Sequence, residues 1–585
     1  MIKKLARSIR EYKKASILTP ILIVGEVLLE CFIPFVMAQM VNAIDEGADM
    51  QEIVKYGIIL AVMAIASLTF GAFAGATCAK ASAGFAKNLR HDMYHSIQNY
   101  SFANIDKFST ASLVTRMTTD VSYVQMAFMM IIRTAIRSPL MLVFSIVMAF
   151  TMGGPLAFIF VVSVPILAFA LIMVAVKAIP TFRRIFKKYD KLNESVEENI
   201  RGMRIVKSFV REDYEKGKFE KASEDVRKHF TKAERIVAIN APVMQTCLYL
   251  NMVGVLLLGS YLVVHFSGTI IKVGELSSML TYGFQMLMSL MMLSMVFVMI
   301  TMAIESAKRI VEVLDETSQL TSKPDAVETV RDGSIRFDHV SFKYSETAAA
   351  FALKDIDLDI GSGQTVGILG MTGSSKTTLI QLISRLYDVT EGSVTVGGVD
   401  VRDYKLEKLR DEVGVVLQKN TLFSGTIREN LRWGKEDATD EEIESVCKLA
   451  QADEFIRSFP QGYDTFIEQG GTNVSGGQKQ RLCIARALLK KPKVLILDDS
   501  TSAVDTRTDA MIRKGLATYM PETTKIIIAQ RVASVMDADL IVIMNNGQIE
   551  TMGTHEQLMA EGGTYREIYE SQTQNTRAEG GEDNV

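Results

Sequence analysis

Residues 363–378 read GQTVGILGMTGSSKTT, an apolar run that enters a glycine-bearing turn and then a helix-forming segment. Such a turn needs glycine where backbone N–H groups close on phosphate, lysine for the outer phosphates and a hydroxyl for magnesium. Gly373, Lys376 and Thr377 fit this pattern. Ser375 stands where a second glycine is usual, so the loop forms only if its backbone angles suit a non-glycine residue. The stretch predicts nucleotide binding on a strand, turn and helix.

Apolar residues are spread unevenly along the 585 residues of the chain, which is too long for one domain of about 100–200 residues. Long apolar runs fill the first half, and the second half alternates strand and helix patterns as a soluble α/β domain does. The net charge of -3 gives no support for a nucleic-acid partner. The cysteines lack metal or redox spacing, which favours reduced, structural roles for all of them: Cys31, Cys78, Cys247, Cys447 and Cys483.

Six runs in the first half are each long enough to cross a bilayer core about 30 Å thick as a helix. The first is too long for the apolar part of a signal peptide, and no small-residue cleavage site follows it, so we predict that it is retained. The predicted transmembrane helices are residues 16–44, 53–80, 124–152, 155–179, 241–266 and 276–303.

The segment before the first run, MIKKLARSIREYKKAS, is rich in Lys and Arg, whereas the short loops between the runs are nearly free of them. The positive-inside rule therefore places the N-terminus in the cytoplasm of a multi-pass protein of the cell (plasma) membrane. The long connections, residues 80–124 and 180–240, then lie on the cytoplasmic side with the C-terminal half. Their charges recur at helical spacing, which predicts helices that continue out of the lipid bilayer.

A polar stretch separates the two halves of the chain and predicts a domain boundary. We expect a membrane domain over residues 1–315, a linker over 316–334, a second domain over 335–575 and a polar tail over 576–585.

The segment NVSGGQKQRLCIARALL, residues 473–489, resembles the signature motif of ABC (ATP-binding cassette) proteins. Further motifs of that family occur along the second half of the chain in the expected order: Tyr344 before the phosphate loop, Gln418 in a glutamine loop, SAVD at Ser502 to Asp505, and QRVAS at Gln530. The resemblance implies a polytopic α-helical membrane domain of six transmembrane helices with long cytoplasmic extensions, followed by a P-loop α/β ATP-binding cassette domain.

The first half is similar to exporters of this family whose subunit has six spans and one cassette. The similar segments are residues 102–121 (with Ala111 where glycine is usual), 198–212 and 304–310. The resemblance implies a half-transporter, an ATP hydrolase coupled to transport, two of which must pair.

The same resemblance implies that ATP and Mg²⁺ are the cofactors. It assigns nucleotide contacts to Tyr344, Gly370, Gly373, Ser374, Ser375, Lys376, Thr377, Thr378 and Gln418, and magnesium contacts to Thr377, Gln418 and Asp498. In the family each ATP lies between the phosphate loop of one subunit and the signature turn of the other. That turn offers positive dipoles at a helix N-terminus. The residues expected to complete the partner's site are Ser475, Gly476, Gly477 and Gln478.

The segment VLILDDSTSAVDT, residues 494–506, carries Asp499 where the family has a catalytic glutamate, and Gln530 stands where the family has histidine. Aspartate is one methylene shorter, which removes about 1–1.5 Å of reach towards the attacking water. Glutamine cannot become cationic. We therefore expect a degenerate, slowly hydrolysing site and a heterodimer with a sister half-transporter. The alternative is a slow homodimer.

The cargo is poorly specified by the sequence. Five methionines recur at steps of three or four residues and predict one face of the last span, suited to variable apolar ligands or to ordinary helix packing: Met288, Met292, Met295, Met299 and Met302.

Glu26 and Glu30 share a face of the first span, where they either attract a cationic amphiphile or pair with Arg133 and Arg137; pairing is slightly favoured. Export of drugs or other lipophilic small molecules is the first expectation. Lipid or peptide export and an ATP-gated channel or regulator are alternatives.

Overall fold

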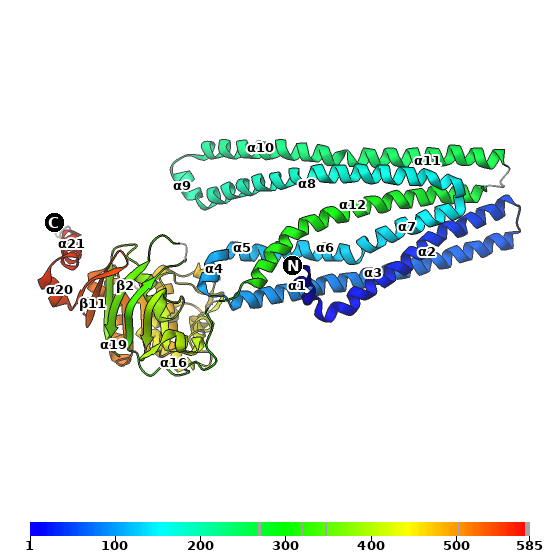
Figure 1. Cartoon of the computed structure of the whole chain (residues 1–585). Helices are drawn as coiled ribbons and strands as arrows, with labels where there is room; N and C mark the ends of the chain where they lie inside the picture. Colours follow the sequence, from blue (N-terminus) through cyan, green and yellow to red (C-terminus); the bar gives the residue numbers. More distant parts are fainter. Residues whose placement is uncertain (267–270, 319, 346–347, 501–503, 580–585) are drawn as a thin grey trace. The chain divides into compact units, whose positions relative to one another are not determined.

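The computed structural model describes residues 1–266, 271–318, 320–345, 348–500 and 504–579 (Figure 1). The chain divides into two compact units. The first, the membrane unit, comprises Met1–Asn99 and Phe108–Glu316. The second, the cassette unit, comprises Tyr100–Lys107 and the chain from Thr317 onward.

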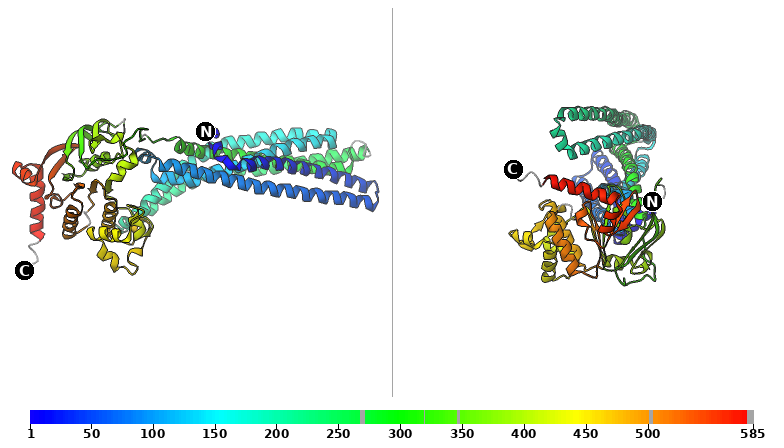
Figure 2. Two further views of the ribbon diagram at one scale, coloured as in Figure 1. Left: turned by 90° about the horizontal axis from the view of Figure 1, so that it is seen from below. Right: turned by 90° about the vertical axis from the view of Figure 1, so that its left-hand side faces the viewer.

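The described part of the membrane unit consists of helices joined by short turns, and its long helices run side by side, as α2 and α3 do in Figures 1 and 2. Its α-helices are α1 (Ile2–Leu5), α2 (Lys13–Asp45), α3 (Met50–Gln98), α5 (Thr110–Thr115), α6 (Val121–Ile132), α7 (Thr134–Gly153), α8 (Phe158–Arg201), α9 (Met203–Ser208), α10 (Glu212–Ala238), α11 (Asn240–His265) and α12 (Val273–Asp315). Three tighter or wider turns join them: η1 (Ala6–Tyr12), η2 (Arg116–Asp120) and η3 (Gly154–Ala157).

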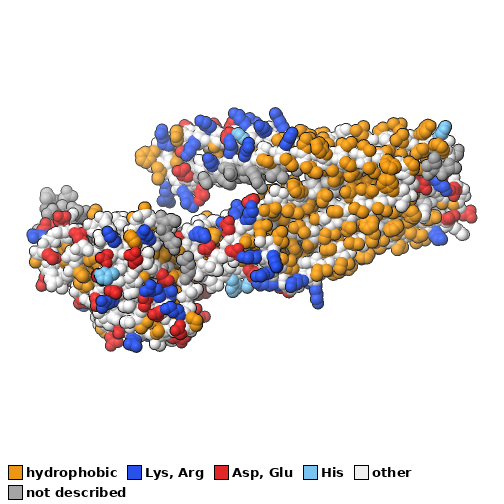
Figure 3. All heavy atoms as spheres, in the orientation of Figure 1, with side chains coloured by type: hydrophobic (Ala, Val, Ile, Leu, Met, Phe, Trp, Pro, Cys, Tyr) orange, Lys and Arg blue, Asp and Glu red, His pale blue; other side chains and the backbone are white. Residues whose placement is uncertain are grey.

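Within the described residues, five helical stretches, some of them made of several consecutive helices, are long and apolar enough to cross a membrane. The third predicted span and most of the fourth fall in one of them, Thr110–Val174, because the turn between the two spans, η3, is itself helical. Hydrophobic side chains cover much of the visible face of these helices, whereas charged side chains gather at the end that carries α9 and α10 (Figure 3). The predicted helical membrane domain is thus confirmed.

Several of these helices are far longer than a bilayer requires. Helix α3 has 49 residues, roughly 70 Å at the usual rise per residue, and α8 and α12 have 44 and 43. The predicted helical extensions are present but broken: α3 ends at Gln98, and α8 and α10 are separated by the short α9.

A buried ion pair fastens the C-terminal part of α12 to η2. Asp120 is fully buried, and it accepts hydrogen bonds from Arg309 Nε at 2.8 Å and from Ser306 Oγ at 2.8 Å. Arg309 Nη2 also donates to Asp120 Oδ1, the oxygen that Ser306 contacts. Because the carboxylate has no access to water, these donors offset the cost of burying its charge.

The cassette unit is built on two main sheets. The larger has the strand order β12-β11-β3-β10-β9-β6, and the smaller has the order β2-β1-β4-β5. The strands are β1 (Ile335–Phe342), β2 (Leu353–Ile360), β3 (Thr365–Gly370), β4 (Glu391–Val396), β5 (Val399–Asp400), β6 (Val413–Val416), β9 (Val494–Asp498), β10 (Thr524–Ile528), β11 (Leu540–Asn545) and β12 (Gln548–Gly553). A small pair, β7 (Gly425–Thr426) and β8 (Phe466–Ile467), lies apart from them in the hydrogen-bond pattern.

Helices pack around these sheets over two apolar cores. They are α13 (Lys376–Ile383), α14 (Leu406–Glu412), α15 (Ile427–Arg432), α16 (Asp440–Leu449), α17 (Asp453–Ser458), α18 (Gly476–Leu489), α19 (Thr506–Tyr519), α20 (His555–Glu561) and α21 (Thr564–Glu579). Strand β9 is buried over all five residues and reads as a continuous apolar run up to its last position, as expected of a parallel strand covered on both faces.

A segment from the first half of the chain belongs to the cassette unit. Residues 100–107 include most of α4 (Phe102–Phe108). Tyr387 Oη donates to Asp106 Oδ2 at 2.7 Å, and Asn104 Nδ2 donates to the Thr317 carbonyl at 3.3 Å. The sequence did not indicate this association.

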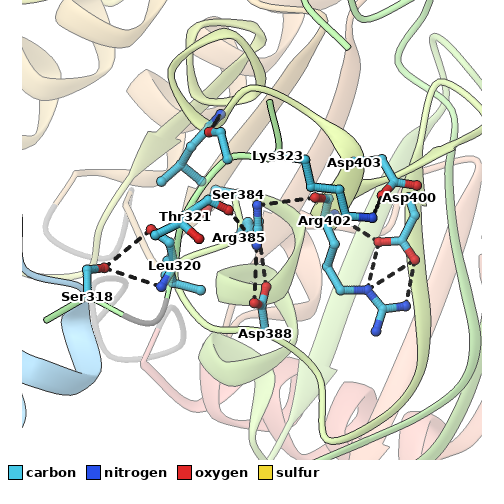
Figure 4. A network of polar contacts seen from close by, with 12 residues as sticks. Ser318, Leu320, Thr321, Lys323, Ser384, Arg385, Asp388, Asp400, Arg402 and Asp403 are labelled. Atoms are coloured by element: carbon cyan, nitrogen blue, oxygen red, sulfur yellow. Dashed lines mark hydrogen bonds and ion pairs between the residues drawn. The ribbon is translucent and has the colours of Figure 1, made fainter. Parts of the chain in front are cut away.

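The stretch predicted as a linker is largely attached to the cassette (Figure 4). The Arg385 side chain, which is almost fully buried, donates to the Thr321 carbonyl at 3.4 Å and pairs with Asp388 at 2.8 Å. Further along, Val327 exchanges backbone hydrogen bonds with Asp403 and Lys405. Val330 is buried in the core of the smaller sheet. Because these groups find partners on the cassette, the segment is ordered by it.

Replacing Asp120 by alanine is expected to destabilise the membrane unit by about 2–3 kcal/mol, because Arg309 and Ser306 lose a buried acceptor. The detergent-solubilised chain is heated to a series of temperatures and run on gel filtration. The measured quantity is the temperature at which half of the monodisperse peak is lost. Asp213→Ala is the control, since the Asp213 side chain is 97% exposed. Equal midpoints for the two variants would contradict the role given to the pair.

Candidate active site

Three parallel strands of the larger sheet end at one edge and bring distant parts of the chain together. Strand β10 pairs in parallel with β3 and with β9, so that Ile528 lies opposite both Ile368 and Asp498. The phosphate loop follows β3, Asp499 follows β9, and Gln530 lies two residues after β10. The carboxyl ends of parallel strands are where ligands of open α/β sheets bind.

The backbone of the phosphate loop uses conformations that favour glycine. Gly370 has φ 155°, and a Cβ there would lie 2.3 Å from the Met544 carbonyl oxygen. Gly373 has φ 85°. Ser375 has φ 69° and ψ 22°, in the left-handed region, and stands at the start of α13. The loop therefore forms with serine in a backbone conformation that costs a non-glycine residue about 1–2 kcal/mol.

Lys376 bends back over the loop that precedes it. Its ammonium donates to the carbonyls of Gly370 and Met371 at 2.7 and 2.9 Å, and to Ser374 Oγ at 3.2 Å. Burial lowers the pKa of Lys376, although Asp498 and Asp499 act in the opposite direction. The lysine is thus held at the mouth of the loop by neutral acceptors, which an anionic phosphate could replace.

Thr377 and Asp498 form the oxygen-rich side of the site. Thr377 Oγ1 donates to Asp498 Oδ2 at 3.0 Å. Asp498 is 2% exposed, and this burial, together with the neighbouring Asp499, raises its pKa. A hydroxyl and a carboxylate in contact, with the Gln418 amide lining the same cavity, are oxygen donors of the kind that Mg²⁺ prefers.

Asp499 and Gln530, the two residues expected to differ from the family's catalytic residues, contact each other. Gln530 Nε2 donates to Asp499 Oδ2 at 2.9 Å. Asp499 has φ 48°, and its backbone N–H donates to the Ile528 carbonyl at 3.0 Å, which ties it to β10. Sequence reasoning singled out both residues but missed their contact, because 31 positions of separation carry no information on side-chain direction.

These residues line one cavity of about 300 Å³. Its lining comprises Thr372, Gly373, Ser374, Ser375, Lys376, Thr377, Thr378, Gln418, Asp498, Asp499, Ile528 and Gln530. Tyr344 lies beside it: its hydroxyl is 2.8 Å from Thr378 Oγ1, and its ring, 49% exposed, packs edge-on against Phe342 and Tyr387. An exposed aromatic face next to the loop leaves room for a base to stack.

The signature turn does not line this cavity. Ser475 caps α18, where its hydroxyl accepts from the Gln478 backbone N–H at 3.3 Å, and the Gln478 side chain accepts from the Ser475 N–H at 2.9 Å. Gly476 and Gly477 form the first turn of the helix. Of the SAVD motif, Ser502 and Ala503 lie outside the described residues; Asp505 caps α19 by accepting from the Thr508 N–H at 2.9 Å.

The donor set of the cavity fits a magnesium nucleotide. An ammonium and the N-terminal N–H groups of α13 suit phosphate, and Thr377 and Asp498 offer oxygen ligands. The Ser500 hydroxyl, buried at the end of β9, has no hydrogen-bond partner among the described residues.

Comparison with known proteins agrees with this geometry. The family model for the ABC transporter transmembrane region matches residues 16–290, and the ABC transporter model matches residues 353–502. An uncharacterized ABC transporter ATP-binding protein of Bacillus subtilis, YfiB, is 35% identical over 98% of both chains. The chain belongs to the ABC transporter family.

Other relatives of the transporter differ in their named cargo. The ATP-dependent lipid A-core flippase of Syntrophus aciditrophicus is 32% identical over 83% of this chain and 80% of its own. The probable multidrug resistance protein YheI of Bacillus subtilis is 34% identical over 81% of both. A solved bacterial Atm1-family ABC exporter with ATP bound shares the fold, with a TM-score of 0.81, 24% identity, and coverage of 96% and 98%.

The chain is therefore an ABC half-transporter, with a membrane domain fused to one cassette, and it has the fold of a solved ABC exporter. Such cassettes bind ATP, typically with Mg²⁺, and couple its hydrolysis to transport. ABC exporters function as dimers in a membrane.

The left-handed backbone at Ser375 predicts an unusual tolerance. Ser375→Gly is expected to keep ATP affinity within about twofold, because glycine adopts this backbone without strain. Ser375→Val is expected to lower the affinity at least about tenfold, since a β-branched residue is a genuine outlier there. Equilibrium binding of a fluorescent ATP analogue to the purified chain distinguishes them. Wild-type ATP affinity in the Ser375→Val variant would contradict the prediction.

Proposed function

We propose that the chain is one subunit of a heterodimeric exporter of drugs or other lipophilic small molecules, and that its own nucleotide site hydrolyses ATP weakly. The observation that carries this proposal is the contact between Asp499 and Gln530. Both positions depart from the family's catalytic pattern, and the side chains that replace it bond to each other.

Two features weaken Asp499 as a general base: the length of its side chain and its contact with Gln530. The aspartate side chain is about 1–1.5 Å shorter than glutamate, and a base must come within about 2.6–3.2 Å of the proton it takes. Its Oδ2 also accepts a hydrogen bond from Gln530. Gln530 can donate to a phosphate only by giving up this bond, and it cannot carry a positive charge.

The remaining residues of the cavity are proposed to bind rather than to hydrolyse. Lys376 and the loop N–H groups would hold the phosphates, Tyr344 would stack on the base, and Thr377, Asp498 and Gln418 would hold Mg²⁺. Supporting observations are the contacts of Lys376 and Thr377 and the exposed Tyr344 ring. Bound ATP would supply an anionic bridge between the two cassettes of the dimer.

The intact signature turn is proposed to complete the catalytic site of a sister half-transporter. Its exposed Ser475 and the first N–H groups of α18 would face the partner's ATP. A second subunit is also supported by the turn around α9, where three large apolar side chains are 64%, 73% and 81% exposed: Ile205, Phe209 and Val210. So much apolar surface at the end of a charged helical hairpin is typical of a contact surface.

Closure of the cassettes on ATP would drive transport, and hydrolysis at the partner's site would reset the dimer. The segment Tyr100–Lys107 supports this scheme, because it is bonded into the cassette unit and is continuous with α3 and α5 of the membrane unit. The charge pattern of the loops supports a plasma-membrane location with both termini and the cassette in the cytoplasm.

The proposed cargo class is supported by the methionine face. Met292, Met295 and Met302 are 38%, 55% and 39% exposed, so they are not consumed by packing within the chain. Flexible thioethers adapt to varied apolar ligands. A lipid cargo is the second candidate, favoured by similarity to the lipid A-core flippase. Uptake into inside-out vesicles separates a pump, which concentrates its cargo, from an ATP-gated channel, which only equilibrates it.

The proposal predicts that ATP hydrolysis at this site is restored only when Asp499 and Gln530 are changed together. Asp499→Glu alone keeps Gln530 beside the new base, and Gln530→His alone lacks the longer carboxylate. We expect each single variant of the dimer to change its ATPase rate less than about twofold, and the double variant to gain more than their product.

The matching change is made in the partner subunit. Replacing its catalytic glutamate by glutamine should lower turnover of the wild-type pair at least about 100-fold. Turnover that survived this change would contradict the heterodimer scheme. An Asp499→Glu single variant with the same ATPase rate as the double variant would contradict the role of the Gln530 contact.

A further inference from the structure

Three charged residues meet within the predicted spans, and we call them the charged triad: Glu26 and Glu30 of α2, and Arg137 of α7. Arg137 Nη1 donates to Glu26 Oε1 at 2.8 Å. Its Nη2 donates to both oxygens of Glu30, at 2.8 and 2.7 Å. Two carboxylates thus share one guanidinium, so the ionised triad carries one negative charge in excess.

Glu26 is the less well paired of the two carboxylates, with one hydrogen bond from Arg137 against two for Glu30. The Glu26 side chain is 7% exposed, and Oε2 is buried without a hydrogen-bond partner among the described residues. Gly71 of α3 closes this side, since a Cβ there would lie 3.2 Å from Glu26 Oε1. Arg133 makes no ion pair with either glutamate in the described part of the chain. An uncompensated charge at such a place is costly unless a cation balances it.

The triad is nevertheless open on its other side. The side chains of Glu30 and Arg137 are 26% and 34% exposed. At 100° per residue, Glu30 lies on the opposite face of α2 from Ile21, which is 60% exposed and belongs to the outward apolar face. A ligand can therefore approach the negative charge from the interior side of the helix layer rather than from the lipid side.

A proline connects the triad to the methionine face of α12. Pro34 has no N–H, so the Glu30 carbonyl four residues earlier lacks its helical donor. Gln285 Nε2 donates to that carbonyl at 3.4 Å, and its Oε1 accepts from Ser145 Oγ at 3.2 Å. Met288 and Met292 follow Gln285 by three and seven residues and so share its face of the helix. The helix that carries the two glutamates therefore contacts α12 at Gln285, on the face that continues into the methionines.

We propose that the charged triad and the methionine face together form a binding site for one organic monocation with apolar substituents. The excess charge attracts the cationic centre, and the thioethers receive the apolar groups without a fixed shape. As a cargo site, it rests on the proposed export of lipophilic small molecules; as a binding site, it stands on the triad alone.

Two probes of the same shape and opposite charge test the site: tetraphenylphosphonium and tetraphenylborate. Binding is measured to the full chain, alone or with its partner, in lipid nanodiscs without nucleotide, and binding to empty nanodiscs is subtracted. Glu26→Gln and Glu30→Gln each bring the triad from net charge −1 to 0 while leaving Arg137 one carboxylate. The double variant brings it to +1.

The affinity for tetraphenylphosphonium should fall at least about fivefold in each single variant and further in the double variant, while that for tetraphenylborate rises. Glu46→Gln, outside the spans and paired with Lys272, should change neither affinity. Met292→Ala with Met295→Ala should lower both. Equal shifts for the two probes, or no shift in the glutamine variants, would overturn the proposal.

The outcome is separable from that of the export proposal. Charge-dependent binding together with no ATP-driven transport of any cargo would leave the site standing and remove the export proposal. ATP-driven export of a neutral dye, with phosphonium binding unaffected by the glutamine variants, would leave export standing and remove the site.

Discussion

The parallel pairing of β10 with β3 and β9 is the constraint on which the nucleotide site depends. It aligns the ends of three strands, so residues from positions 370–378, 498–499 and 530 meet at one edge without any local sequence relation. Burial of β9 then acts on the chemistry, because it delivers Asp498 to that edge with little access to water and raises its pKa. The same geometry places Asp499 next to Gln530, and the proposal of a weakly hydrolysing site rests on that contact.

In the membrane unit, the comparable constraint is the cost of charge in an apolar surrounding. Asp120 is fully buried and fully bonded, which stabilises the contact between η2 and α12. Glu26 is nearly as buried, but one of its oxygens has no hydrogen-bond partner among the described residues. Protein interiors rarely leave such a group unsatisfied unless a ligand or an ion completes it. The contrast between the two carboxylates distinguishes a structural pair from a candidate binding site.

Much of the fold could be predicted because its signals are strong and local: apolar runs for the spans, and glycines and a lysine at fixed spacing for the phosphate loop. Helical periodicity could not choose between Arg133 and Arg137 as the partner of the glutamates, since both are four residues apart on one face. The structure decides for Arg137, because Arg133 lies at the break between α6 and α7, with φ −114° and ψ −72°. The docking of Tyr100–Lys107 and of residues 320–330 on the cassette also escaped prediction, because it depends on partners such as Asp106, Tyr387 and Arg385 that are remote in sequence. These contacts are tertiary, and no periodicity encodes them.

The central claim is that this chain lends its signature turn to a partner's active site and hydrolyses little at its own. Steady-state ATPase of the assembled dimer tests it with two variants of this chain, Ser475→Ala and Asp499→Asn. An asymmetric dimer predicts that Ser475→Ala lowers the rate at least about tenfold, whereas Asp499→Asn changes it less than about twofold. Equal losses from both variants would mean that both sites hydrolyse alike, and would contradict the claim.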